Sequence, residues 1–222
     1  MERKYYEAYD DRYRQVHREN LQWFGDIPSN IVRNVIVRYT ISGSILEIGC
    51  GEGRDAGDLL KQDFDLLATD ISEQAVAFCR RRWPEYAHKF QVMNCIGGKL
   101  NARFEFIYAI AVLHMLVQQE DRTGFYQFIR EHLTENGYAL ICTMGDGIME
   151  RSTDISEAFD LQERIHEQTG TRLFVAGTSY RAISFDTFER EIRENGLMTV
   201  EQGITNVEPD YGKMMYAVVK KS

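Results

Sequence analysis

The sequence ILEIGCGEGR, at residues 45–54, decides the fold of this 222-residue chain. A largely apolar segment runs into three glycines at every second position, Gly49, Gly51 and Gly53, and a helical pattern follows. Glycine permits tight turns and lets a ligand approach the backbone where a Cβ atom would clash. The stretch therefore predicts a buried strand, a glycine-rich turn that contacts a ligand, and a helix.

The spacing of the glycines argues against a dinucleotide as the ligand. A dinucleotide-binding loop has the spacing G-x-G-x-x-G, but Arg54 stands where its third glycine would be. Asp70, at the end of the next predicted strand, can accept hydrogen bonds from both hydroxyls of a ribose. A ribose site without a pyrophosphate site indicates a nucleoside-type cofactor.

Apolar runs and helical patterns alternate on both sides of this stretch, which is typical of an α/β domain with a mainly parallel sheet. The predicted strands are Ser44–Gly49, Leu66–Asp70, Lys89–Asn94, Phe104–Ile110, Tyr138–Met144, Thr199–Thr205 and Lys213–Lys220. The predicted helices are Gly53–Lys61, Ser72–Arg82, which opens with a Ser72 N-cap, Asp121–Leu133 and Asp186–Asn195. The last two strands, joined by Asn206–Gly212, form a hairpin, so the final strand must run antiparallel to its neighbour.

Two segments lie outside this alternation. Residues 1–40 are predicted to form an N-terminal helical cap with a break at residues 25–28, ahead of a main domain at 41–222. Residues 145–182 are predicted to form an insertion above the sheet, with helical character from Ser156 to Gln168.

Composition limits the classes of partner. Acidic residues outnumber basic ones by 34 to 26, so the net charge of −8 makes nucleic acid an unlikely substrate. The run Arg80–Arg82 ends a predicted helix, where basic side chains complement the helix dipole. No apolar run is long enough to span a bilayer and the N-terminus does not resemble a signal peptide, so we expect a cytoplasmic protein with no membrane partner. The four cysteines and five histidines show no metal-ligand spacing, so no metal site is expected.

Four segments together resemble a known family. LEIGCGEGRDA (46–56), ATDIS (68–72), FEFIYAIAVLHML (104–116) and NGYALICT (136–143) are similar to the successive signature segments of class I S-adenosylmethionine-dependent methyltransferases, in particular those that act on small molecules. The resemblance implies a Rossmann-like α/β fold: a seven-stranded, mostly parallel sheet with an antiparallel last strand and helices on both faces. It also implies S-adenosylmethionine as the cofactor.

The resemblance assigns cofactor contacts by position. It places Glu47 near the amino group of the cofactor, Asp70 on the ribose and Ile71 against the adenine. Many relatives carry an aspartate after the third strand, where this chain has Asn94, whose amide oxygen can also accept a hydrogen bond. The remaining positions implied to line the cofactor are Gly49, Cys50, Gly51, Cys95, Ala109, Ile110 and, from the N-terminal segment, Tyr13.

His114 is the candidate catalytic base, because it follows the fourth strand at the edge where the sulfonium would lie. A positioned base contributes about 10²–10⁴-fold when the acceptor must lose a proton. A histidine that only packs or hydrogen-bonds at the start of a helix remains an equal alternative.

Tyr5, Tyr9 and Tyr13 recur every four residues, so they form an aromatic stripe on one helical face. The stripe either docks the helix on the core or covers the cofactor, where its rings attract a cation and exclude water. The candidate acceptor-binding residues are Tyr5, Tyr9, His114 and, from the insertion, Asp146, Tyr180 and Arg181. Acidic residues there would suit an amine acceptor and Arg181 a carboxylate, and the sequence does not decide between them.

The leading hypothesis is therefore methyl transfer to nitrogen or oxygen of a small-molecule acceptor. One alternative is methylation of a macromolecule, RNA or protein; the RNA branch is disfavoured by the charge and by the absence of an Asn-Pro-Pro-Tyr-like tetrad after the fourth strand. A second alternative is a protein that binds the cofactor or another nucleoside without catalysis. A nicotinamide-dependent oxidoreductase is the weakest hypothesis, because Gly53 is misplaced for a dinucleotide.

Overall fold

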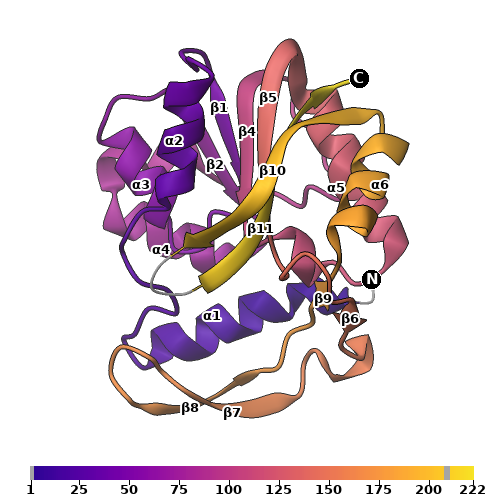
Figure 1. Cartoon of the computed structure of the whole chain (residues 1–222). Coiled ribbons are helices and arrows are strands. Elements are labelled where there is room, and N and C mark those ends of the chain that lie inside the picture. Colours follow the sequence, from indigo (N-terminus) through magenta and orange to yellow (C-terminus); the bar gives the residue numbers. More distant parts are fainter. Residues whose placement is uncertain (1–2, 208–210) are drawn as a thin grey trace.

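A seven-stranded sheet forms the centre of the computed structural model, which describes residues 3–207 and 211–222. The strand order is β10-β11-β5-β4-β1-β2-β3, and β11 is antiparallel to both of its neighbours. The other neighbouring pairs run parallel. The predicted Rossmann-like α/β sheet with a reversed last strand is confirmed (Figure 1).

The strands follow the predicted apolar segments, with ends that shift by a few residues. The central strand β1 is buried along its whole length, as expected for a parallel sheet covered on both faces. The sheet strands are β1 (Ile45–Ile48), β2 (Leu66–Asp70), β3 (Phe90–Val92), β4 (Phe104–Ile110), β5 (Leu133–Met144), β10 (Leu197–Val207) and β11 (Tyr211–Lys221). Residues 208–210 of the predicted hairpin connection lie outside the described residues.

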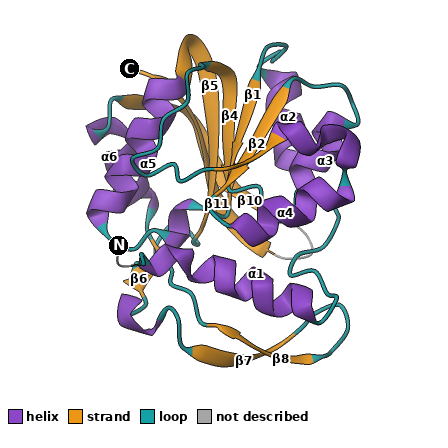
Figure 2. Cartoon of the chain, turned by 180° about the vertical axis from the view of Figure 1, so that it is seen from behind, coloured by secondary structure: helices purple, strands orange, loops and turns teal. Residues whose placement is uncertain are grey.

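Helices cover both faces of the sheet (Figures 1 and 2). Neighbouring residues on one strand pack on opposite faces: Phe106 contacts the cluster that includes α2, α3 and α4, and Ile107 contacts the cluster that includes α5 and α6. The α-helices are α1 (Ala8–Arg18), α2 (Asn30–Arg38), α3 (Arg54–Leu60), α4 (Glu73–Arg82), α5 (Gln119–His132) and α6 (Phe185–Glu194). Short 3₁₀ helices are η1 (Tyr5–Glu7), η2 (Pro84–Lys89), η3 (Leu113–Met115) and η4 (Ile155–Glu157).

The two N-terminal helices occupy different places. Helix α2 packs on a face of the sheet through apolar residues such as Val32 and Val35. Helix α1 lies across the end of the sheet, between the sheet and the hairpin of β7 (Leu161–Ile165) and β8 (Arg172–Ala176) (Figure 1). Asp10 of α1 accepts hydrogen bonds from the Ser72 hydroxyl at 2.8 Å and the Gln74 N–H at 3.1 Å, which fixes α1 against the start of α4.

The insertion corrects one prediction. Residues Ser156–Gln168 were expected to be helical, but β7 (Leu161–Ile165) and β8 (Arg172–Ala176) form an antiparallel hairpin there. The hairpin gains its stability from α1: Leu173 and Val175 pack on Val16, and the Gln15 amide oxygen accepts from the Ala176 N–H at 2.7 Å. These partners are remote in sequence, so local periodicity could not reveal the strand. A second short pair, β6 (Arg151–Ser152) and β9 (Arg181–Ala182), closes the base of the insertion.

Candidate functional site

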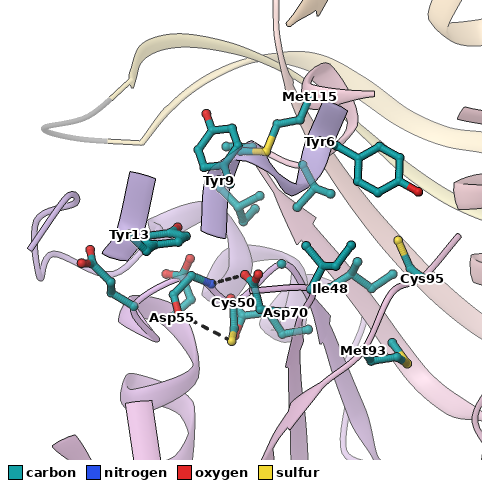
Figure 3. Close-up of a pocket in the computed structure, with 18 of the residues that line it drawn as sticks. Tyr6, Tyr9, Tyr13, Ile48, Cys50, Asp55, Asp70, Met93, Cys95 and Met115 are labelled. Atoms are coloured by element: carbon teal, nitrogen blue, oxygen red, sulfur yellow. Dashed lines mark hydrogen bonds between the residues drawn. The ribbon is translucent and has the colours of Figure 1, made fainter. Parts of the chain in front are cut away.

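A pocket opens where β1, β2 and β4 end, under helix α1. Figure 3 shows Tyr6, Tyr9 and Tyr13 on one side of it, with Cys50 and Asp70 opposite. Ligands of open parallel sheets bind at this edge, because strand ends and loops there leave a crevice. The pocket is lined by Tyr6, Tyr9, Tyr13, Phe24, Glu47, Ile48, Gly49, Cys50, Gly51, Glu52, Arg54, Asp55, Asp70, Ile71, Met93, Asn94, Cys95, Ile96, Ile110, Ala111, Val112, Met115, Leu116 and Tyr211.

The glycine-rich turn has the backbone conformation that the sequence predicts. Gly49, Gly51 and Gly53 have φ angles of +73°, +52° and +75°. A Cβ atom on Gly49 would lie 2.3 Å from a methyl carbon of Val112, and one on Gly51 would lie 2.7 Å from the hydroxyl oxygen of Tyr13. Because other residues pay a steric cost in this region and would also clash, the turn requires glycine.

Asp70 is buried at the end of β2 and anchors the turn. One of its carboxylate oxygens accepts the Gly51 N–H and the other accepts the Ser72 N–H, both at 2.8 Å. Burial raises the pKa of Asp70 to about 6, although these two backbone hydrogen bonds oppose the shift. Each oxygen retains acceptor capacity for a ribose hydroxyl.

Glu47 supplies the test of whether the pocket fits the cofactor. Its side chain is 3% exposed, and its Oε2 atom has no hydrogen-bond partner among the described residues. Burial raises the pKa of Glu47 well above its usual range, and the nearby Asp55 raises it further. An orphaned buried carboxylate oxygen that lines the pocket is suited to an ammonium group, which would pair with it and lower that pKa. The amino group of S-adenosylmethionine fits this position.

Glu52, in the same turn, holds the last turn of α1 and the segment that follows it. Its Oε1 accepts from His17 Nε2 at 2.8 Å and from the Trp23 N–H at 2.9 Å, and its Oε2 accepts from the Phe24 N–H at 2.9 Å. The glycine-rich turn therefore holds part of its own cover in place.

The tyrosines of the aromatic stripe have two different roles, lining the pocket and anchoring the N-terminal segment. Tyr9 and Tyr13 line the pocket, and so does Tyr6, which receives a hydrogen bond from the Asn94 amide at 3.4 Å. Tyr5 points elsewhere: its hydroxyl donates to Asp121 at 2.7 Å and accepts the Val117 N–H at 2.9 Å. The stripe thus both docks the N-terminal segment and covers the pocket.

A second cavity, of about 350 Å³, adjoins the first. The two cavities share three lining residues, Tyr9, Phe24 and Tyr211. The second cavity extends between α1 and the hairpin β7–β8. Its other lining residues are Arg12, Trp23, His114, Met144, Arg164, Ile165, His166, Glu167, Gly177, Thr178, Ser179 and Tyr180.

His114 lines this second cavity rather than the first. The residue is 2% exposed, and its Nδ1 atom has no partner among the described residues. Burial lowers the pKa of His114 to about 3, and the positive charge of Arg122 lowers it further. The imidazole is therefore neutral near pH 7, and it can accept a hydrogen bond but has little driving force to take up a proton.

The structure brings most of the predicted site residues together. All predicted cofactor contacts line the first pocket except Ala109, which is buried in the sheet. Among the predicted acceptor contacts, Tyr9, His114 and Tyr180 line the second cavity. Tyr5, Asp146 and Arg181 line neither cavity. Asp146 accepts the Ile148 and Met149 N–H groups in an exposed turn, and Arg181 donates to the Val117 carbonyl at 3.3 Å.

Several residues that line the two cavities are not among the site residues that the sequence predicts. Arg12 stands three residues after Tyr9, on the face of the aromatic stripe, so helical spacing could have drawn attention to it. Arg54 and Asp55 directly follow the glycine-rich turn, so their place in the sequence could also have identified them as pocket residues. Tyr211 gave no signal, because only the reversal of β11 brings it to the pocket.

Comparisons with known proteins agree with this geometry. Residues 46–139 match a family model described as a methyltransferase domain. A comparison with curated proteins gave no significant match. Among the described residues, no helix is long and apolar enough to cross a membrane.

Three solved structures show the extent of the fold similarity. An S-adenosylmethionine-dependent methyltransferase from Clostridium acetobutylicum has a TM-score of 0.68 and 14% identity, over 98% of this chain and 99% of that one. A Burkholderia thailandensis 1,6-didemethyltoxoflavin-N1-methyltransferase, with bound 1,6-didemethyltoxoflavin and S-adenosylhomocysteine, has a TM-score of 0.70 and 17% identity, over 100% of this chain and 92% of that one. A glycopeptide N-methyltransferase in complex with S-adenosylhomocysteine has a TM-score of 0.65 and 18% identity, over 90% of this chain and 91% of that one. Residues 46–139 thus match a methyltransferase domain in sequence, and the whole chain has the fold of S-adenosylmethionine-dependent methyltransferases.

Proposed function

We propose that the protein transfers a methyl group from S-adenosylmethionine to a nitrogen or oxygen atom of a small-molecule acceptor. The observation that carries the proposal is the pair of adjoining cavities. The first has the glycine-rich turn, Glu47 and Asp70, and the second shares the side chains Tyr9, Phe24 and Tyr211 with it. A cavity of about 350 Å³, walled by α1 and the hairpin β7–β8, suits a small acceptor.

Each part of the first cavity has a binding task. Glu47 would hold the ammonium group of the cofactor and Asp70 would accept hydrogen bonds from the ribose hydroxyls. Ile71 and Asn94 would contact the adenine. When bound, the cofactor supplies a methyl group that its sulfonium has already activated.

The chain then has to align the acceptor and keep water away. Alignment of reacting groups contributes on the order of 7–11 kcal/mol. Tyr9 and Tyr13, 9% and 4% exposed, exclude water between α1 and the strand ends. His114, neutral near pH 7, would accept a hydrogen bond from the N–H or O–H of the acceptor and so orient its lone pair.

The test has a binding stage and a turnover stage. Calorimetry with S-adenosylhomocysteine and with NAD should show affinity for the first and none for the second. The protein is then incubated with S-adenosylmethionine and separate pools of small amines, phenols, carboxylates, peptides and RNA, and release of S-adenosylhomocysteine is measured.

Turnover confined to small acceptors is the expected result. Turnover with RNA or peptide alone would assign the macromolecular alternative. Binding of the cofactor without transfer to any pool would assign a non-catalytic role, and no affinity for the cofactor would overturn the proposal.

A further inference from the structure

Arg12 is a buried cation in the wall of the second cavity. The residue is 6% exposed. Its Nε and Nη2 atoms donate to the Ala176 carbonyl at 3.0 and 2.6 Å, and Nη2 also donates to the Gly177 carbonyl at 2.7 Å. The guanidinium carbon lies 5.0 Å from the centre of the Tyr9 ring and 4.8 Å from that of Trp23. All of these partners are electrically neutral.

No carboxylate among the described residues lies within ion-pair distance of Arg12. On its own helix, Asp10 pairs with Arg14, and Asp11 pairs with Arg3 and Arg14. From the facing hairpin, Arg164 and Glu167 line the cavity, but both are exposed. The charge of Arg12 is therefore uncompensated on the inner wall, which is costly unless an anion neutralises it.

The guanidinium of Arg12 also has hydrogen-bond donors that no described residue uses. Nη1 makes no hydrogen bond to any described residue, whereas Nε and Nη2 are fully used by the two carbonyls. The two N–H groups of Nη1 can therefore donate to an anion. A hydrogen bond from a guanidinium to a carboxylate is shorter and stronger than one between neutral groups. Five aromatic side chains also line the cavity, Tyr9, Trp23, Phe24, Tyr180 and Tyr211, and the first two of these lie against the guanidinium.

We propose that the acceptor is an aromatic molecule with a carboxylate group, and that this carboxylate binds beside Arg12 in the second cavity. The inference rests on the proposed function, since it names the class of acceptor for the same site. Arg12 holds the anionic end, the aromatic walls contact the ring, and His114 receives the N–H or O–H of the group to be methylated. The sequence alone left open whether this cavity favours an amine or a carboxylate; the buried arginine favours the carboxylate.

Matched pairs of ligands test the proposal on the unaltered protein. Calorimetry on the protein saturated with S-adenosylhomocysteine compares 4-hydroxybenzoate with 4-hydroxybenzamide, and indole-3-acetate with indole-3-acetamide. Each pair keeps the ring and replaces the charge by a neutral group of similar size. We expect the carboxylates to bind about tenfold more tightly or better, the effect of one charge-assisted hydrogen bond.

Three variants locate the effect. Arg12→Met should abolish the preference for carboxylates and Arg12→Lys should keep part of it, because lysine retains the charge but not the planar fork. Arg18→Met is the matched control, since Arg18 is an exposed residue at the end of the same helix, outside both cavities, and should leave the preference unchanged. Circular dichroism and titration with S-adenosylhomocysteine check that each variant is folded. If Arg12→Met fails to fold, Arg12→Lys and the ligand pairs still show whether the preference for carboxylates depends on Arg12.

Equal affinity for carboxylate and amide, no binding of either carboxylate, or a preference that survives in Arg12→Met would overturn the inference. Arg12 would then only fasten the hairpin to α1. Retained binding of S-adenosylhomocysteine and methyl transfer to neutral acceptors would in that case leave the proposed function standing. Loss of cofactor binding by the unaltered protein would instead refute the proposed function itself.

Discussion

Tyr13 packs directly over Gly51, so that a Cβ atom on Gly51 would lie 2.7 Å from the phenol oxygen of Tyr13. The next nearest atom, the ring carbon that carries the hydroxyl, would lie 3.7 Å away, which is an ordinary contact. Only the hydroxyl oxygen therefore makes the fit between helix α1 and the glycine-rich turn intolerant of a side chain. The helix that covers the pocket and the turn that forms its floor have to be considered together.

Gly51→Ala should lower both stability and affinity for S-adenosylhomocysteine, because the new methyl group clashes with Tyr13 and φ of +52° costs an alanine about 1–2 kcal/mol. The double variant Gly51→Ala/Tyr13→Phe should recover the loss of stability and affinity that the clash causes. It should retain the loss that the backbone angle causes. Thermal unfolding and calorimetry of the two variants and of Tyr13→Phe alone measure both parts. If Tyr13→Phe restores nothing, the contact between Tyr13 and Gly51 is not what excludes a side chain.

The affinity for S-adenosylhomocysteine should fall as the pH drops through about 6. Burial raises the pKa of Asp70 to about 6, and ribose hydroxyls donate to the charged carboxylate, so protonation competes with binding. At pH 5 the dissociation constant should be about tenfold higher than at pH 7.5. Asp70→Asn should bind weakly and lose the part of the pH dependence that Asp70 contributes near pH 6, while Glu47→Gln, which leaves Asp70 intact, should keep the step. A pH-independent affinity in the unaltered protein would argue that Asp70 does not contact the ribose.

The same shift acts in the opposite direction on the stability of the cofactor-free protein. Because the folded state raises the pKa of Asp70, it binds the proton more tightly than the unfolded chain does. The stabilisation from this group is complete below about pH 4 and is lost as the pH rises through about 6. Denaturant unfolding of the unaltered protein and of Asp70→Asn, compared at pH 4 and pH 7, should show that the variant loses this dependence.

Replacement of His114 should reveal a positioning group and not a strong base. Since burial lowers the pKa of His114 to about 3, the imidazole is unprotonated throughout the neutral range and the turnover rate should show no inflection near pH 6.5 at saturating cofactor. His114→Ala should reduce kcat/KM by roughly tenfold, the value of one neutral hydrogen bond, and His114→Gln should recover part of this. A loss of 10²-fold or more, together with an inflection near pH 6.5, would instead establish general-base catalysis.

The loop that carries His114 depends on a buried ion pair between α5 and α6. Arg122 donates to the Glu191 carboxylate through Nε at 2.8 Å and Nη2 at 2.7 Å, and its Nη1 donates to the carbonyls of Leu113 and Leu116. Arg122→Met should destabilise the fold by about 3–5 kcal/mol, since it removes the cation that hydrogen-bonds the buried carboxylate of Glu191 and leaves that carboxylate with the more distant Arg181, 3.9 Å away. The double variant Arg122→Met/Glu191→Leu should be more stable than Arg122→Met. Thermal unfolding measures the stability of both variants, and a double variant no more stable than the single one would mean that lost packing, not the buried charge left on Glu191, dominates the loss.

Local chemistry determined the parts of this protein that lie close together in the sequence. The strand β1, the turn with Gly49 and Gly51, and the helix after it follow from apolar and glycine patterns within ten residues. The N-cap of α4 follows from Ser72, whose hydroxyl accepts the Ala75 N–H at 3.1 Å. For the same reason the position of Asp70 at the pocket could be predicted, because it stands at the end of a strand whose direction the sheet fixes, whereas the position of Glu47 was implied by the family resemblance.

Tertiary structure decided everything that depends on partners remote in sequence. The hairpin β7–β8 forms against α1, where Arg12 binds the Ala176 carbonyl across a separation of 164 residues. Tyr5 leaves the aromatic stripe because Asp121, 116 residues away, takes its hydroxyl. His114 has a lowered pKa only because the fold buries it near Arg122. Burial and charge pairing are properties of the packed chain, so the residues that set the character of the second cavity could not be recognised until the fold had brought them together.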